Sequence, residues 1–353
     1  MDRMNKAIEN MQKNGIDQML VTTTSDIFYL TGEWIDPGER FLGLLLNSNG
    51  DKKLFINKLF PVKTKNIKSF IYEDKENPIE IFSSHINKNK RLGIDKNWSA
   101  KFLIELMEKI NIKVFNSSKV IEGMRVIKDA EEINKMRLSS QINDKAMKEV
   151  QKLIPNMMTE KMVARAVSNI LEKLGAEGNS FEPIIAYGEN AGEPHHISDK
   201  TKIKHGDSVI IDMGGVKDFY CSDMTRTIFF GAPKDEYKKI YNIVLEANLK
   251  GIEAVKPGNK FSDVDNAARS VIEKAGYGEY FTHRTGHNIG IDVHEWPNVS
   301  SDNDMELKPG MIFSVEPGIY LNGKVGVRIE DLVLVTKNGC EVLNSFDKSF
   351  NII

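Results

Sequence analysis

Asp212 and Asp223 are the residues whose placement first indicates chemistry. Asp212 directly follows the apolar run 209–211, which predicts a short buried strand. After the Gly214-Gly215 turn the chain returns to Asp223, so we expect the second carboxylate on a neighbouring strand beside the first. A buried carboxylate is costly unless a partner compensates its charge, and two neighbouring carboxylates resist joint ionisation. A bound cation is the simplest compensation.

Three residues further along the chain have side chains that could bind the same cation. His287 lies in HRTGHNIG, Glu316 follows the apolar run of MIFSVEPG, and Glu330 lies in GVRIED between apolar stretches. With the two aspartates they form an oxygen-rich set with one imidazole and no thiolate, which suits a pair of divalent metal ions. Four carboxylates also balance the charge of two such ions.

The composition limits the classes of partner. The 353 residues include 48 Lys and Arg against 50 Asp and Glu, a formal net charge of -2, with no basic block. This balance argues against nucleic acid and anionic membranes as partners. The N-terminal sequence MDRMNKAIEN is charged and no stretch approaches about 18 apolar residues, so we expect neither a signal peptide nor a spanning helix. Cys221 and Cys340 give no disulfide framework, which predicts a cytoplasmic protein.

Residues 1–122 predict an N-terminal α/β domain. The chain opens with an amphipathic helix whose apolar positions include residues 4, 8 and 11. The apolar runs FLGLLL and KLFIN are joined through Asn49-Gly50, a strong hairpin signal, and RLGID is typical of a parallel strand. A helix over about 99–110 follows. This part of the chain carries no catalytic constellation.

Residues 123–353 predict a second α/β domain that contains an internal repeat. In its first half, Asp129 caps a helix with a capping-box-like start, and Thr159 opens a second helix. In its second half, a helix begins near Asp235 and Ser262 caps the next helix. Each half is therefore expected to begin with two helices.

The offsets between the halves indicate that the repeat includes the carboxylates. Thr159 and Ser262 are 103 positions apart, and Asp212 and Glu316 are 104 positions apart. Each half would then be two helices followed by an antiparallel strand pair that bears two carboxylates. A pseudo-twofold packing of the halves would bring both carboxylate pairs to a shared interface, and His287 would be an addition to that symmetry.

Five ordered motifs resemble those of a known enzyme family. The segments GDSVIIDMGG, CSDMTRT, HRTGHNIGIDVHE, KPGMIFSVEPGIY and GVRIED are similar to those of Xaa-Pro dipeptidases (prolidases), aminopeptidase P and, more distantly, methionine aminopeptidases. The resemblance covers Asp129 to the C-terminus. It implies the pita-bread fold of the creatinase and methionine aminopeptidase type, and the separate N-terminal domain resembles that of prolidases and aminopeptidase P.

Position by position, the resemblance implies a dinuclear metal site. The implied ligands are Asp212, Asp223, His287, Glu316 and Glu330. None is substituted, whereas creatinase-like relatives keep the fold without metals. We expect manganese, with cobalt or zinc as alternatives, and two such ions can activate a water molecule and polarise the scissile carbonyl. Glu316 would also serve as the general base.

The same resemblance assigns further catalytic side chains. His195, His283 and His294 match the family's substrate-facing histidines, and Arg328 matches its active-site arginine. His283 is expected to stabilise the tetrahedral oxyanion, and His294 to contact the scissile region of the substrate.

The substrate pocket must accept a tertiary amide, because a proline nitrogen at the cleaved bond has no N–H. Phe181, Tyr187 and Tyr320 are candidate walls for the proline ring. Arg284 and Asn288 stand where glycine is common in the family, which would narrow the site.

Three functions compete for this sequence. An Xaa-Pro dipeptidase is favoured by the short N-terminal domain and by the EWP segment 295–297. A dipeptidase must pair the free carboxylate of its substrate with a cation. Some prolidases place an arginine after this WP pair, whereas this chain has Asn298, so Arg284 or Arg328 would have to substitute. Aminopeptidase P, which acts on longer peptides, is the alternative, and a non-catalytic binding module is disfavoured by the intact ligand set.

The loop from Trp34 to Arg40 is a candidate for contact between subunits. In the relatives this domain helps to form a dimer and can close over the partner's active site. The resemblance therefore implies a homodimer, with Trp34 or Arg40 near the other subunit's metal cleft and proline-containing dipeptides or short peptides as substrates.

Overall fold

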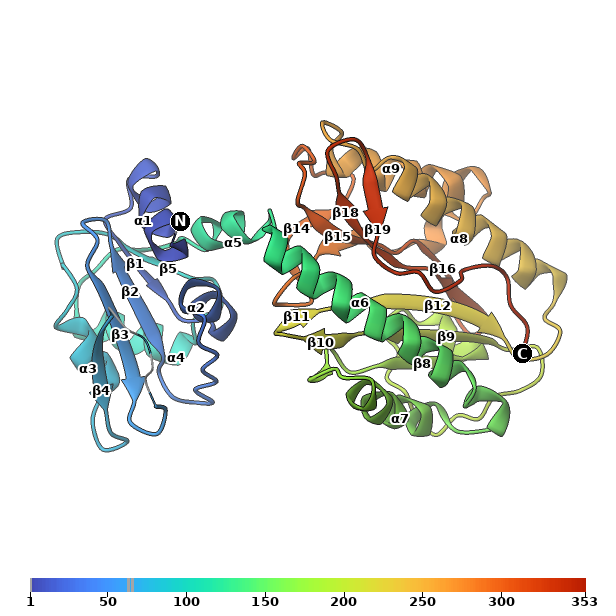
Figure 1. Cartoon of the computed structure of the whole chain (residues 1–353), viewed down its shortest axis with the longest axis horizontal. Coiled ribbons are helices and arrows are strands. Elements are labelled where there is room, and N and C mark those ends of the chain that lie inside the picture. Colours follow the sequence, from blue (N-terminus) through green and yellow to red (C-terminus); the bar gives the residue numbers. More distant parts are fainter. Residues whose placement is uncertain (1, 62–63, 65–66) are drawn as a thin grey trace. The chain divides into compact units, whose positions relative to one another are not determined.

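The computed structural model describes residues 2–61, 64 and 67–353. The chain divides into two units, Met1–Met124 and Arg125–Ile353, and the division falls within helix α5 (Lys119–Arg125). Figure 1 draws the first unit from blue to cyan-green and the second from green to red. In the described part of the chain, no helix combines the length and the apolar character needed to cross a bilayer.

The first unit is built on a mixed sheet in the order β4-β3-β2-β1-β5-β6. Its strands are β1 Gln18–Val21, β2 Gly43–Asn47, β3 Lys52–Asn57, β4 Lys68–Tyr72, β5 Leu92–Ile94 and β6 Val114–Asn116. The predicted hairpin at Asn49-Gly50 is confirmed, since β2 and β3 pair antiparallel and Gly50 takes a φ of 96°. The predicted parallel strand is confirmed as well, because β5 runs parallel to β1 and β6.

Helices cover this sheet through their apolar faces. They are α1 Arg3–Lys13, α2 Thr24–Thr31, α3 Pro78–Ser83 and α4 Ala100–Lys109. In α1 the predicted positions Ile8 and Met11 are buried together with Ala7, whereas Met4 is only partly buried, and Gly15 follows the helix end with a φ of 65°. The unit's core gathers aromatic rings such as Phe41, Phe55 and Phe82.

The second unit opens with two helices and an antiparallel strand group. These elements are α6 Ala130–Gln151, α7 Glu160–Lys173, β8 Ile184–Tyr187, β9 Ser208–Met213 and β12 Met224–Phe229. Asp129 caps α6 in a full capping box with Glu132, and the Thr159 side chain caps α7, so both predicted helix starts are confirmed. The strand order is β12-β9-β8, and α6 and α7 bury their apolar faces against it.

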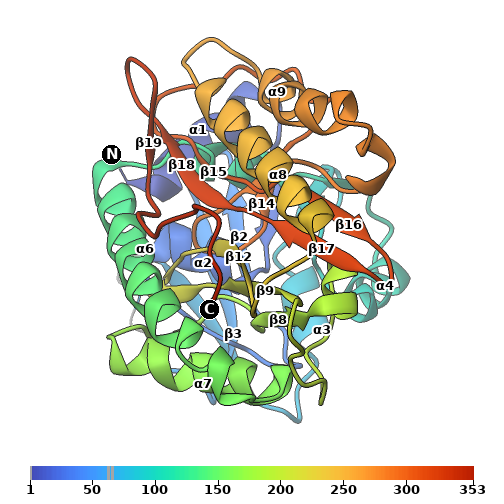
Figure 2. The same cartoon turned by 90° about the vertical axis from the view of Figure 1, so that its right-hand side faces the viewer.

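The second half repeats this arrangement. Its corresponding elements are α8 Asp235–Glu253, α9 Phe261–Lys274, β15 Ile312–Val315 and β18 Asp331–Val335. The strands β15 and β18 pair antiparallel, as β9 and β12 do, so the predicted repeat of two helices and an antiparallel strand pair is confirmed. Figure 2 shows the two helix pairs on opposite sides of the strands.

One predicted helix start was wrong. Ser262 does not cap α9, because the helix begins at Phe261, two residues earlier than a serine cap would give, and Lys260 occupies the cap position. The Asp263 carboxylate accepts from the backbone N–H of Lys260 at 2.8 Å, while the Ser262 hydroxyl donates to Asp304 instead. The carboxylate in the first turn therefore satisfies the helix end that the serine was expected to satisfy.

Shorter elements complete the second unit. They are η1 Ile154–Asn156, β7 Gly178–Asn179, η2 Gly188–Gly192, β10 Gly215–Lys217, β11 Tyr220–Cys221, η3 Gly278–Tyr280, β13 Gly286–Asn288, β14 Glu295–Val299, β16 Gly318–Leu321, β17 Val325–Arg328 and β19 Cys340–Val342. The strand order β14-β13-β15-β18-β19 places β13 next to β15. The last residues of the chain run beside β12, where the backbones of Phe229 and Asn351 are hydrogen-bonded.

Candidate active site

Strand ends bring the predicted metal ligands to one place. Asp212 lies near the end of β9, opposite Thr225 of β12, and Asp223 directly precedes β12. In the second half, Glu316 directly follows β15 and Glu330 directly precedes β18. Because β9 pairs with β12 and β15 pairs with β18, each half delivers its two carboxylates from neighbouring strands, as the sequence predicted. His287 comes from β13, which pairs with β15.

A cavity of about 790 Å³ joins these side chains. Its volume lies within the range typical of small-molecule sites, about 300–1,000 Å³. The lining residues are Ser180, Phe181, Ile184, Pro194, His195, Asp212, Asp223, His283, Arg284, His287, Val293, His294, Glu316, Arg328 and Glu330. The cavity thus contains the five predicted ligands, the three predicted histidines and the predicted arginine.

The geometry of three of these residues fits a metal ion directly. Ligand atoms of Asp223, His287 and Glu330 all lie within 4.8 Å of one another. One oxygen each of Asp212, Asp223 and Glu330 is buried without a hydrogen-bond partner among the described residues. Buried carboxylate oxygens without donors are costly, and a divalent cation satisfies them. The residues present therefore fit a divalent metal site.

The orientation of His287 supports the same conclusion. Its Nδ1 lies 3.2 Å from the Asn288 carbonyl oxygen, which can only accept, so Nδ1 carries the proton. Nε2 is then free of a proton and faces the carboxylates, 3.4 Å from Glu316 Oε1 and 3.7 Å from Asp223 Oδ2. A backbone carbonyl that fixes the tautomer in this way is typical of metal-binding histidines.

Crowding of the carboxylates has the expected electrostatic result. Burial raises the pKa of Asp223, and the neighbouring charges of Glu330, Asp212 and Glu316 raise it further. Burial and the charges of Glu316 and Asp212 likewise raise the pKa of Glu330. Without a cation this cluster holds protons, and a cation reverses that preference.

Arg328 is fully engaged in the wall of this cavity. Its guanidinium donates to Asp212 Oδ2 at 2.7 Å, to the Thr225 hydroxyl at 3.0 Å and to the Tyr320 hydroxyl at 2.9 Å. A fourth contact reaches the carbonyl of Pro194 at 3.3 Å. The Thr225 hydroxyl in turn donates to Glu330 Oε2 at 2.7 Å. The arginine therefore holds candidate ligands from both halves in place.

The three predicted histidines occupy different environments. His283 points Nδ1 at the Arg284 carbonyl oxygen at 2.7 Å and Nε2 at the Tyr320 hydroxyl at 2.9 Å. Burial lowers the pKa of His283 to about 4, so its ring is neutral and accepts from Tyr320 at Nε2. His195 and His294 also line the cavity but are more exposed. His294 packs edge-on against the His287 ring at 4.2 Å between centroids.

The buried carboxylate of Glu160 holds the loop that carries His195 in place through hydrogen bonds. Glu160 Oε1 accepts from the backbone N–H of Tyr187 and from Asn190, and its Oε2 lies 2.8 Å from His196 Nε2 and 3.1 Å from the Asp199 backbone nitrogen. Glu160, His196 and Asp199 also have the spacing of a metal site. Because protein donors already fill both Glu160 oxygens, the cluster acts as a clamp on this loop.

The three side chains predicted to line the pocket for the proline ring lie in three different places. Phe181 lines the cavity. Tyr187 does not: it is 1% exposed and belongs to the apolar core formed by α6, α7 and β9. Side chains alternate along β8, so Ile184 faces the cavity and Tyr187 faces the opposite side of the sheet. Tyr320 lies behind the cavity wall, where its hydroxyl joins His283 and Arg328.

Sequence reasoning missed some apolar and small lining residues. Ser180, Ile184, Pro194 and Val293 complete the cavity wall. Ile184 could have been found from the alternation of the strand IIAY, had its register been fixed. The other three lie in loops, for which the sequence offered no periodic signal.

A repeated α/β fold that encloses a buried cluster of carboxylates and imidazole in a cavity defines a metal-dependent enzyme. The chain belongs to metallopeptidase family M24: residues 134–337, more than half of its length, match that family. Residues 3–127 match the Creatinase/Prolidase N-terminal domain. The predicted family and the predicted pita-bread type of fold are therefore confirmed.

Individual relatives align over nearly the whole chain. An uncharacterized peptidase of Staphylococcus haemolyticus is 37% identical over 353 residues, which is 99% of this chain and 100% of the relative. The crystal structure of a dipeptidase from Pyrococcus horikoshii has a TM-score of 0.94 at 37% identity and covers 99% of this chain and 100% of its own. A prolidase from Thermococcus sibiricus gives a TM-score of 0.95 at 37% identity, with 99% and 98% covered.

Proposed function

We propose that this metallopeptidase is an Xaa-Pro dipeptidase that hydrolyses the bond before a C-terminal proline. The observation that carries the proposal is a single cavity in which the buried carboxylate and imidazole cluster faces an apolar wall of Phe181, Ile184 and Val293. An apolar surface beside the cluster suits a proline ring, which has no N–H to satisfy. The similarity to solved structures described as a dipeptidase and a prolidase supports the same substrate class.

The proposed cofactor is a pair of divalent ions, with manganese expected and cobalt or zinc as alternatives. The proposed ligands are Asp212, Asp223, His287, Glu316 and Glu330. Divalent ions in such a site supply Lewis acidity, which lowers the pKa of water and polarises a carbonyl. Glu316 is the proposed general base, and burial raises its pKa above that of an ordinary glutamate, which favours proton uptake.

The remaining side chains bind and orient the substrate in this proposal. His294 and His195, at the more open part of the cavity, are placed to contact the peptide. The proton of the neutral His283 ring lies on Nδ1 against a backbone carbonyl, and Nε2 accepts from Tyr320. The proposed donation to a developing oxyanion therefore requires Nε2 to release Tyr320 and to take up a proton. Arg328 keeps Asp212 and Tyr320 in position from behind.

A pair of peptides tests the substrate class. With manganese present, the chain should hydrolyse Ala-Pro and leave Ala-Pro-Ala-Ala largely intact, and Asp223→Asn should lose the activity. Preferential cleavage of the tetrapeptide would instead make the chain an aminopeptidase P. If Asp223→Asn still hydrolyses the peptides as the wild type does, a metal-dependent reaction at this site is contradicted.

We further propose that residues 1–122 form a dimerisation domain and that residues 123–353 form the catalytic domain of a cytoplasmic homodimer. Trp34 is 45% exposed, a large apolar surface that a partner subunit could cover. Sedimentation of the wild type should give a dimer, and Trp34→Ser should lower activity without changing the thermal stability of either unit. A fully active monomer would rule this assembly out.

A further inference from the structure

Two arginines line the cavity, and they differ in how many of their donors have a hydrogen-bond partner. The guanidinium of Arg328 already donates to Asp212, Thr225, Tyr320 and the Pro194 carbonyl. An additional anion would have to displace one of these partners. Arg328 is therefore a poor candidate for binding a substrate carboxylate, although its position in the cavity makes it an obvious one.

In the described part of the chain, the guanidinium of Arg284, in contrast, has a donor without a partner. Its side chain is half-buried and lines the cavity, and its Nε is buried without a hydrogen-bond partner among the described residues. Among the described residues its guanidinium forms no ion pair, whereas that of Arg328 pairs with Asp212. A guanidinium has five donors in a rigid fork, and a buried donor without a partner is costly. An unused donor set of this kind points to a ligand that supplies the acceptors.

Arg284 lies close to the residues that are proposed to react. It lies between His283 and His287 in the chain, and all three line the cavity. Its charge also acts on Glu316, the proposed general base. In an Xaa-Pro dipeptide the free carboxylate is only one residue, about 3.6 Å of chain, from the scissile bond. A cationic side chain that binds this carboxylate must therefore lie close to the metal ligands, as Arg284 does.

We propose that Arg284 binds the α-carboxylate of the substrate's C-terminal residue and thereby restricts the enzyme to dipeptides. This inference rests on the proposed function. A carboxylate can pair with the guanidinium fork through two parallel hydrogen bonds, which a longer peptide or an amide cannot do. A substrate without the carboxylate leaves the fork desolvated and unpaired. Asn298, which follows Trp296-Pro297, is uncharged and cannot supply this interaction.

The test compares substrates that differ only in the terminal group. Wild type should hydrolyse Ala-Pro with a kcat/KM about 10- to 100-fold above that of Ala-Pro amide, the range expected for one charge-assisted pair. Arg284→Met should lower kcat/KM for Ala-Pro more than for Ala-Pro amide, so that the ratio between the two substrates falls toward one. Arg284→Lys should recover part of the preference, because it restores the charge without the fork.

A matched control removes another arginine. Arg165→Met, at an exposed position of α7, should keep the wild-type ratio of the two substrates. A thermal melt of each variant separates loss of folding from loss of recognition. Equal losses on Ala-Pro and its amide in Arg284→Met, or no preference for the free carboxylate in wild type, would overturn the proposal.

A second substrate pair separates this inference from the proposed function. Leu-Ala and Leu-Ala amide contain the same terminal groups without proline. If wild type prefers Leu-Ala over its amide in an Arg284-dependent manner but ignores Ala-Pro, the proline specificity is wrong and the role of Arg284 stands. If Ala-Pro is hydrolysed but Arg284→Met does not alter the preference for the free carboxylate, the proposed function stands and the inference is wrong. Hydrolysis of neither pair would overturn both.

Discussion

At the scale of single residues, the main feature of the site is an excess of negative charge without donors. Asp212, Asp223 and Glu330 each present a buried oxygen that finds no hydrogen-bond partner among the described residues. The charges of Asp212 and Glu316 raise the pKa values of Asp223 and Glu330, in addition to the effect of burial. Such a cluster is destabilising in the absence of a cation, so folding and metal binding should be coupled.

Metal addition should therefore stabilise the protein measurably. A divalent ion at 100 times its dissociation constant adds about 2.7 kcal/mol to the free energy of unfolding. The thermal melting temperature should fall after chelation and rise again with manganese. Asp223→Asn should remove most of this metal-induced rise, whereas Asp302→Asn, at an exposed position, should keep it. An equal rise in both variants would mean that the metal binds elsewhere.

The residue types of the site could be predicted from the sequence more readily than the directions of the side chains. Three of the candidate ligands, Asp212, Glu316 and Glu330, adjoin apolar runs, and this placement at strand ends is visible in the sequence. Tyr187 was misplaced because a strand of four residues does not reveal which of its faces meets the cavity. Ile184, three positions earlier, occupies the face that Tyr187 was expected to share.

At the scale of elements, β14 is held to the start of the second unit by buried ion pairs. Glu295 pairs with Arg125 and, at 3.1 Å, with Lys128, and it also accepts from the backbone N–H of Ile291. Its side chain is 5% exposed. These contacts close the loop that ends in His294. Burial alone would raise the pKa of Glu295, but the two cations outweigh burial and lower it to about 2.

The low pKa of Glu295 predicts a loss of stability in acid. Its folded pKa of about 2 lies below the 4.5 of an ordinary glutamate, so the folded state releases this proton more readily than the unfolded state. The resulting stabilisation, of order 3 kcal/mol, is present above about pH 4.5 and disappears as the pH falls toward 2. Urea unfolding at pH 5 and pH 3 should show a larger drop for wild type than for Glu295→Gln. Equal drops would assign the acid sensitivity to other carboxylates.

Helix starts show why some elements could be predicted and others could not. Asp129 and Glu132 form a capping box whose two partners both appear in the sequence signature. At α9 the sequence predicted Ser262 as the cap, but the carboxylate of the adjacent Asp263 satisfies the helix end. Tertiary contact decides between them, because Asp304 engages the serine hydroxyl. That contact comes from a residue 42 positions away and leaves no local signal.

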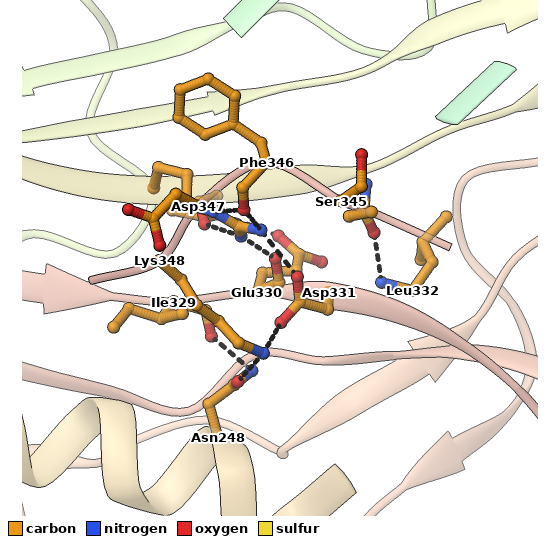
Figure 3. A network of polar contacts seen from close by, with 12 residues as sticks. Asn248, Ile329, Glu330, Asp331, Leu332, Ser345, Phe346, Asp347 and Lys348 are labelled. Atoms are coloured by element: carbon orange, nitrogen blue, oxygen red, sulfur yellow. Dashed lines mark hydrogen bonds and ion pairs between the residues drawn. The ribbon is translucent and has the colours of Figure 1, made fainter. Parts of the chain in front are cut away.

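At the scale of the whole catalytic unit, the C-terminal segment 344–353 connects the two halves of the repeat. Arg226 of β12 donates to Asp331 Oδ1 at 2.7 Å and to the Phe346 carbonyl at 2.8 Å. Lys348 reaches Asp331 Oδ2 at 2.5 Å and Asn248 of α8 at 2.7 Å, as Figure 3 shows. Burial would raise the pKa of Asp331, but these two cations lower it.

Removing the buried arginine of this network should destabilise the unit strongly. Arg226→Met leaves Asp331 buried with one cation in place of two, and breaking such a pair costs about 3–5 kcal/mol. Arg137→Met offers a matched control, because Arg137 also links the halves, through Glu341, but both side chains are 38% exposed. That surface pair should contribute about 0–1 kcal/mol. Chemical unfolding of the two variants measures the difference, and similar losses would contradict a special role of the buried network.

The repeat could be predicted from the sequence, whereas this connection could not. Helix starts and carboxylates recur at nearly constant offsets, so the halves are visible as a period. Arg226 and Asp331 are 105 positions apart, and Arg226 and Phe346 are 120 apart. The first separation is close to the repeat offset of 103 to 104, but a period does not show that equivalent positions of the two halves touch, and the second separation does not follow from the period. A charged residue within a buried strand carries no indication of its partner. Only the folded arrangement identifies the pair.

The same segment makes the site sensitive to proteolysis. Asn344 donates to the carbonyl oxygen of Asp223, and the backbone of Ile353 is hydrogen-bonded to Phe229 and Gly231. A proteolytic cut that removes residues 344–353 would take away both supports at once. Such a cut should loosen the backbone of Asp223 and of the adjoining β12, and it should therefore weaken metal binding as well as stability.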